Sequence, residues 1–242
     1  MTNLTTTDLP TGQPTDLPIG PGEASGPPID LYREVHKGLR VALSDLVQEV
    51  GSLDASDAES VAVFSALFDD IDMMLATHHA HEEGGRLGEL IAQHVDADVV
   101  RSAHEAHDRF EAMLHDLRVA VAALSSGGTD TERLYDDVVA FVAAYLLHMN
   151  VEEQQVMPAL RSRVDHDELF GITMEIRTSV PPPEMCVFLR YMLPAMNPDE
   201  RVGTLGGMKA GAPPDIFEMF WGVAERSLAA GDLAEVADRL AS

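Results

Sequence analysis

Histidines and glutamates recur inside the apolar stripes of this sequence, where ionisable side chains are rare. Six of them fall on the faces that helices would turn toward a core: His36, His78, Glu82, His107, His148 and Glu152. A buried ionisable side chain is costly unless it is paired or bound to a metal ion. A core histidine that hydrogen-bonds a neighbouring helix would be an ordinary explanation for any single position. The whole set is better explained by a metal site.

The spacing of these residues indicates what kind of metal site this would be. His78 and Glu82, and likewise His148 and Glu152, are four residues apart. Such pairs project from one face of a helix about a turn apart. Two pairs would supply terminal imidazoles and two carboxylates able to bridge a pair of metal ions. Imidazole and carboxylate ligands suit iron, manganese or zinc, and the single cysteine, Cys186, excludes a thiolate site.

Four long amphipathic stripes would position these residues. They run from Tyr32 to Val50, from Val61 to Glu82 with a weaker continuation to Val95, from Val100 to Leu124, and from Leu134 to Leu160. We therefore expect an all-α protein, an up-down-up-down four-helix bundle over residues 29–164. Neighbouring helices of such a bundle run in opposite directions. His36 and His107, which come early in their helices, therefore fall in one layer with the two His-Glu pairs, which come late in theirs.

The flanking segments differ from the bundle in composition. Residues 1–28 are rich in Thr, Pro and Gly without periodicity, so we expect a disordered arm. Prolines cut residues 165–242 into short helical pieces, which predicts a small C-terminal helical subdomain.

Charge and composition indicate which partners and which cellular compartment to expect. Asp and Glu number 41 against 16 Lys and Arg, a formal net charge of −25, which would repel nucleic acid and anionic membranes. The first thirty residues hold no Lys or Arg and no apolar run, so they do not look like a signal peptide, and we expect no membrane span. We expect a cytoplasmic protein. The sequence does not set its oligomeric state.

Four separated motifs together resemble the hemerythrin family in its bacterial HHE cation-binding form. They are His36-Lys-Gly-Leu-Arg, His78-His-Ala-His-Glu82-Glu, His104-Glu-Ala-His107-Asp and His148-Met-Asn-Val-Glu152-Glu, in this order between about Leu31 and Leu160. The resemblance implies a non-haem diiron centre, with a pair of irons per chain joined by an oxo or hydroxo bridge. It also implies reversible binding of dioxygen or a related small molecule, such as peroxide or nitric oxide, and a role in oxidative or nitrosative stress.

Several residues near the motifs leave alternatives open. His104 is a candidate further ligand, although its spacing of three from His107 departs from the family. Glu153 competes with Glu152 for the acid position on the fourth helix, and the apolar stripe favours Glu152. His79 lies off the centre of its stripe, which favours a solvated surface position. Tyr145 is expected to pack in the core or to hydrogen-bond a bound ligand.

Three functions compete for such a site. The first is a binding protein for a small molecule, favoured by the histidine-rich ligand set and by only two bridging carboxylates. The second is a diiron oxidase or peroxidase, and the third is an iron-responsive sensor whose tail reads out metal loading. A helical bundle with zinc or without metal is the alternative to all three. We expect a binding protein rather than an enzyme, so no catalytic residue is predicted.

Overall fold

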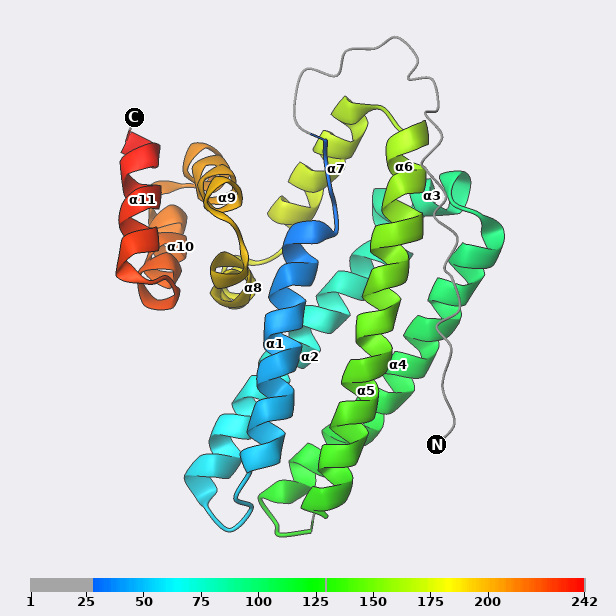
Figure 1. The fold of residues 1–242 in the computed structure, drawn as a ribbon, viewed down its shortest axis with the longest axis vertical. Coiled ribbons are helices and arrows are strands. Elements are labelled where there is room, and N and C mark those ends of the chain that lie inside the picture. Colours follow the sequence, from blue (N-terminus) through cyan, green and yellow to red (C-terminus); the bar gives the residue numbers. More distant parts are fainter. Residues whose placement is uncertain (1–27, 129, 242) are drawn as a thin grey trace, which may run out of the picture.

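The computed structural model describes residues 28–128 and 130–241 of the 242-residue chain. In these residues the chain forms helices joined by short turns, with no β-strand, which confirms the all-α prediction. The predicted disordered arm lies outside the described residues, apart from Pro28. The helices are α1 (Arg33–Ser52), α2 (Ala58–Glu83), α3 (Gly85–His94), α4 (Ala97–Leu124), α5 (Thr131–Val151), η1 (Glu152–Val156), α6 (Met157–Arg163), α7 (His166–Ser179), α8 (Pro182–Ala195), α9 (Pro198–Gly211), α10 (Pro214–Ser227) and α11 (Ala230–Ala241) (Figure 1).

Four long helices lie side by side and enclose an apolar core (Figure 1). α1 packs against α2 and α5, and α4 packs against the same two helices. Asp57, Asp96 and Asp130 start α2, α4 and α5, because each side chain accepts a hydrogen bond from an otherwise unpaired N–H of the first turn. Inside, the predicted stripes meet and bury their apolar side chains, such as those of Leu43 and Phe141, which stabilises the fold.

The second predicted helix is divided in two by a pair of glycines. α2 ends at Glu83, Gly84 is extended, and Gly85 has a φ of 60°, a left-handed conformation that glycine adopts without strain. The chain then resumes as α3, which packs against α6. The expectation of one helix fading toward Val95 was therefore wrong: the apolar stripe continues, but in a separate helix with a new direction.

The fourth predicted helix contains a wide turn. α5 continues into η1 and α6, and the N–H of Met157 donates to the carbonyl of Glu152, five residues back. Pro158 has no N–H and would clash with the carbonyl four residues before it in a regular α-helix. The π-helical turn spreads the backbone at this place, so that the helix passes the proline and continues to Arg163.

The stretch Thr131–Arg163 is long and apolar enough to cross a membrane by length and composition alone. One face of it packs in the core of the described structure, where Phe141 and Tyr145 are fully buried. A core helix of a soluble protein passes the same test, so the stretch carries little weight as evidence for a membrane span.

The C-terminal helices lie beside α1 (Figure 1). α8 packs along α1, α10 packs on α8, and α11 packs on α9. The contact between α1 and α8 is very close at Gly38, where an added Cβ would lie only 2.6 Å from Cγ of Met192. Leu189 of α8 belongs to the same apolar cluster as Leu39 of α1. The predicted boundary at residue 164 falls between α6 and α7, and beyond it the core continues into α8.

Candidate metal centre

The structure brings six of the predicted ligand residues together at one level of the four long helices. His36 lies in the first turn of α1 and His107 in the first half of α4, whereas the two His-Glu pairs lie where α2 and α5 end. All six side chains are buried, with exposed fractions between 0% for His36 and 7% for His78. Each of the four long helices therefore contributes donors to one water-poor site.

The donor atoms form two groups that share one carboxylate. The first group contains His36, His78 and Glu152, and the second contains Glu82, His107, His148 and Glu152. In the first group, Nε2 of His36 lies 3.3 Å from Nε2 of His78 and 3.3 Å from Oε2 of Glu152. In the second, Nε2 of His148 lies 2.8 Å from Nε2 of His107 and 2.7 Å from Oε1 of Glu152. Glu152 thus turns one oxygen toward each group.

Glu82 also reaches both groups. Its Oε1 is 3.6 Å from Nε2 of His78 and its Oε2 is 3.4 Å from Nε2 of His107. Both of these oxygens, and Oε2 of Glu152, are buried and accept no hydrogen bond from the described residues. Buried carboxylate oxygens without partners are costly, and a bound cation would satisfy them. The arrangement fits a metal site with nitrogen and oxygen ligands.

The two glutamates titrate in opposite directions because their neighbours differ. Burial, and then the negative charge of Glu152, raises the pKa of Glu82 well above its usual value. Burial also acts to raise the pKa of Glu152, but the hydrogen-bonding histidines around it, His107 and then His148, outweigh burial and hold this pKa well below the usual value. Burial lowers the pKa of His78, which keeps its imidazole neutral. Neutral imidazoles and an ionised carboxylate are the forms that bind metal.

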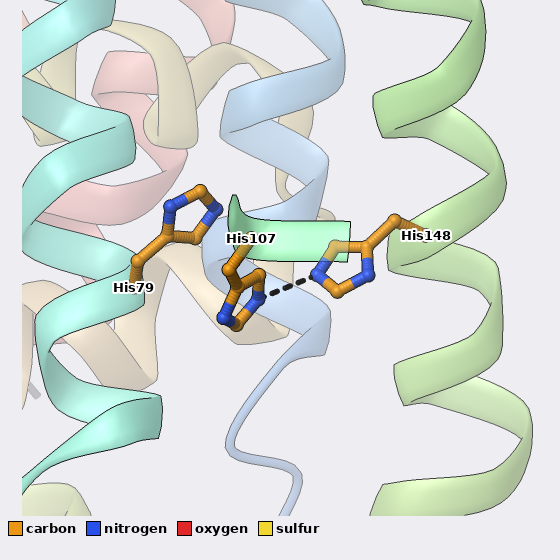
Figure 2. Close-up of side chains that lie close together, drawn as sticks. All are labelled: His79, His107 and His148. Atoms are coloured by element: carbon orange, nitrogen blue, oxygen red, sulfur yellow. Dashed lines mark hydrogen bonds between the residues drawn. The ribbon is translucent and has the colours of Figure 1, made fainter. Parts of the chain in front are cut away.

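His79 belongs to this site, although the sequence favoured a solvated position. Figure 2 shows its ring beside His107 and His148, and the three form a further group of possible ligands. The ring stacks on His107 with centroids 4.2 Å apart, and its Nε2 lies 2.9 Å from the hydroxyl oxygen of Tyr145. Burial, and then the charge of His107, lowers the pKa of His79 to about 3. The surface interpretation was therefore wrong.

Two further candidates lie outside the donor groups. His104 is exposed and lines a surface depression with Arg101 and Asp108, so the structure does not bring it to the other predicted ligands. Glu153 turns away from the donor groups: its Oε1 lies 2.9 Å from Nδ1 of His36 and 2.7 Å from Nη1 of Arg40. The hydrogen bond from His36, and then Arg40, lowers the pKa of Glu153 to about 2.

The family model of the hemerythrin HHE cation binding domain matches residues 27–177. This chain belongs to the hemerythrin HHE family. The match covers more than half of the sequence and includes all the donor residues, so the resemblance noted from the four motifs is confirmed. Neither the curated proteins nor the solved structures gave a match. As a member of the HHE family with a buried His-Glu cluster, the protein is a cation-binding protein.

Proposed function

We propose that this protein holds two irons per chain, in an up-down-up-down bundle, and binds dioxygen or a related small molecule such as nitric oxide or peroxide. The observation that carries this proposal is the division of the site into two donor groups that share Glu152. A single ion would need one group, whereas a carboxylate with an oxygen in each group is placed to join two ions. Histidine and glutamate without sulfur suit non-haem iron.

An iron pair at this site would supply exchangeable electrons and an open position for a small ligand. The surrounding side chains would control what reaches it. The ring of Phe110 lies 5.2 Å from that of His148, and the ring of Tyr32 lies 6.4 Å from that of His78. These aromatic side chains are no more than 2% exposed. They leave little room for water or for an organic substrate, which supports reversible binding of a small ligand.

The alternative of an enzyme acting on an organic substrate finds less support. Two surface cavities of the described structure have volumes of about 320 and 610 Å³. The larger lies between α1, α8 and α10 and is lined by Arg190 and Cys186, among others. None of the donor residues lines either cavity, so neither connects an organic substrate with the site.

One contact favours the iron-responsive sensor as a second candidate. His36 is two residues before Gly38, where α8 makes its close approach to α1, and Lys37 between them forms a 2.6 Å ion pair with Glu200 of α9. A change in the position of His36 on metal loading would therefore act directly on the C-terminal helices. Amide hydrogen exchange of α8 and α9, with and without iron, measures this coupling. Unchanged exchange would contradict the sensor function.

Metal analysis and optical spectroscopy test the main proposal. We expect close to two irons per chain in protein from iron-rich cells, and a spectrum that changes on adding oxygen to the reduced protein and returns when oxygen is removed. Glu152→Ala should lower the iron content, because both donor groups lose an oxygen, whereas Glu89→Ala, at an exposed position, should not. One iron or one zinc per chain would overturn the two-iron centre. Irreversible bleaching by oxygen would overturn reversible binding.

A further inference from the structure

The glutamate that follows each donor glutamate contacts a histidine on a neighbouring helix. Glu83 comes directly after Glu82 at the end of α2, and its Oε1 lies 2.8 Å from Nδ1 of His107 on α4. Glu153 comes directly after Glu152 in η1, and the corresponding distance to Nδ1 of His36 on α1 is 2.9 Å. In both contacts, the glutamate after a donor glutamate lies within hydrogen-bond distance of Nδ1 of a donor histidine on another helix.

Helix geometry explains why both sequence pairs behave alike. Successive residues of an α-helix point about 100° apart, since 3.6 residues make one turn. The wider π-helical turn η1, which contains Glu152 and Glu153, rotates somewhat less per residue, but it also turns the second side chain away from the first. When the first glutamate of a pair points into the site, the second points sideways, toward the next helix. α4 is one of the neighbours of α2, and α1 is one of the neighbours of α5. Each Glu-Glu pair therefore reaches the site with one carboxylate and a histidine from the adjacent helix with the other.

These contacts decide which nitrogen of each ring carries the hydrogen. An ionised carboxylate only accepts hydrogen bonds, so Nδ1 of His36 and Nδ1 of His107 must donate. In a neutral ring, Nε2 then carries the free lone pair. Nε2 is the atom that faces the donor groups, 3.3 Å from Oε2 of Glu152 for His36 and 3.4 Å from Oε2 of Glu82 for His107.

We propose that Glu83 and Glu153 are positioning residues, which hold His107 and His36 with Nε2 free and directed at the metal. The proposal rests on the metal site proposed above. It gives each Glu-Glu pair two roles: the first glutamate is a ligand, and the second fixes the ring orientation of a ligand on another helix. A carboxylate that is hydrogen-bonded to the far nitrogen of a metal-binding histidine also makes the other nitrogen a stronger electron-pair donor to the metal.

The carboxylates of Glu153 and Glu83 differ in exposure and in the number of their partners. Glu153 is 22% exposed and is fixed by Nη1 of Arg40 at 2.7 Å. Glu83 is 49% exposed and is the last residue of α2, beside Gly84, and its carboxylate has no other partner among the described residues. Water competes for an exposed carboxylate, so Glu83 constrains the ring of His107 less than Glu153 constrains the ring of His36. Loss of Glu153 should therefore have the larger effect.

Nitrogen NMR of the full-length, metal-free protein tests the hydrogen placement directly. Long-range ¹H–¹⁵N spectra, recorded at a pH where the spectra show both rings neutral, report which ring nitrogen carries hydrogen. We expect Nδ1–H for His36 and His107. Glu153→Gln should change the spectrum of His36, and Glu83→Gln that of His107, because an amide can donate to Nδ1. The control Glu89→Gln removes an exposed charge on α3 and should change neither.

Metal affinity supplies the second measurement. Competition with a coloured Fe(II) chelator should show each Gln variant to bind Fe(II) about 10–100-fold more weakly than the wild type, with Glu153→Gln the weaker binder. Rings that carry hydrogen on Nε2 in the wild type would overturn the proposal, as would unchanged affinity in both variants. If Glu153→Gln does not fold, the half-exposed Glu83→Gln still decides. Rings with Nδ1–H in a wild type that binds no iron would contradict the proposed function and leave the positioning hydrogen bonds in place.

Discussion

Replacing Glu82 by methionine should stabilise the metal-free protein and remove most of the stabilisation that metal provides. Both carboxylate oxygens of Glu82 are buried and accept no hydrogen bond from the described residues. Methionine has a similar length and no oxygen, so it fills the space without the unsatisfied atoms. In the metal-loaded protein the same change removes a proposed ligand and should lower the gain in stability that binding gives.

The size of the effect follows from burial. A buried polar group without a partner costs about 1–3 kcal/mol, and removing it should return a similar free energy of unfolding. For a chain of this size each kcal/mol moves the melting temperature by roughly 2–4 °C. We therefore expect the metal-free variant to melt roughly 2–12 °C above the metal-free wild type.

The difference in free energy of unfolding between the metal-free Glu82→Met variant and the metal-free wild type should increase with pH. The unfolded chain ionises Glu82 near its usual pKa of 4.5, whereas burial and the charge of Glu152 raise the pKa in the folded protein. The free energy of unfolding of the wild type is therefore highest, as far as Glu82 is concerned, below pH 4.5. It falls as the pH rises from 4.5 through the raised pKa, because the folded protein then holds a proton that the unfolded chain has lost. Methionine does not titrate, so its advantage should grow by up to about 1.4 kcal/mol per pH unit across this window.

Thermal melts followed by circular dichroism, with and without iron at several pH values, measure these differences. The control is Glu89→Met, at an exposed position of α3, which should change stability by no more than about 0.5 kcal/mol. A metal-free Glu82→Met protein that melts below the wild type would refute the reasoning. It would mean that the oxygens of Glu82 have partners, such as the hydroxyl of Tyr32 or ordered water, whose loss costs more than the burial of an unsatisfied carboxylate.

Three further predictions concern the packing and the metal. Gly38→Ala forces a Cβ to within 3.1 Å of the backbone nitrogen of Met192, whereas Gly203→Ala meets nothing within 4 Å; in urea unfolding, the second variant should be more stable than the first by about 1–3 kcal/mol. Equal stability would show that α8 yields freely. Tyr145→Phe removes the hydroxyl beside His79 and should cost about 1 kcal/mol without changing the iron count; loss of iron would give the pair a direct role in binding. The difference in melting temperature between iron-loaded and metal-free protein should shrink below about pH 6, because imidazoles must lose a proton to bind metal, and a constant difference would place the metal elsewhere.

Stripe periodicity predicted the residues that meet in the site, because burial depends on helix phase and phase can be read from a single helix. The same reasoning failed for His79. Its direction is one residue away from the stripe that contains His78, and only the position of α4 and α5 decides whether that direction faces solvent or protein. Tyr145, which it contacts, lies on another helix 66 residues away. No pattern within α2 reports such a contact.

Interruptions of the helices were partly readable. Pro158 disfavours a regular helix and Gly84-Gly85 favours an interruption, but the stripes alone led to the expectation of one continuous helix at each place, because neither residue type gives the geometry. The roles of Glu83 and Glu153 depend on which helices are neighbours, and the close approach at Gly38 depends on where α8 docks. These are consequences of tertiary packing, which the sequence specifies only through the whole fold.

The break at Gly84-Gly85 has a consequence for the kinetics of metal exchange. On one side of the site, α1 is covered by α8, and His36 is completely buried. On the other side, α2 ends at a half-exposed Glu83, and Gly85 turns the chain away into α3. Local opening needs least free energy where few buried contacts must be broken. The exposed residues Glu83, Gly84 and Gly85 offer fewer such contacts than the face of α1 that α8 covers. If an ion or a small ligand enters and leaves there, the exchange rate follows the local stability of residues 83–85, while the affinity follows the buried donor residues.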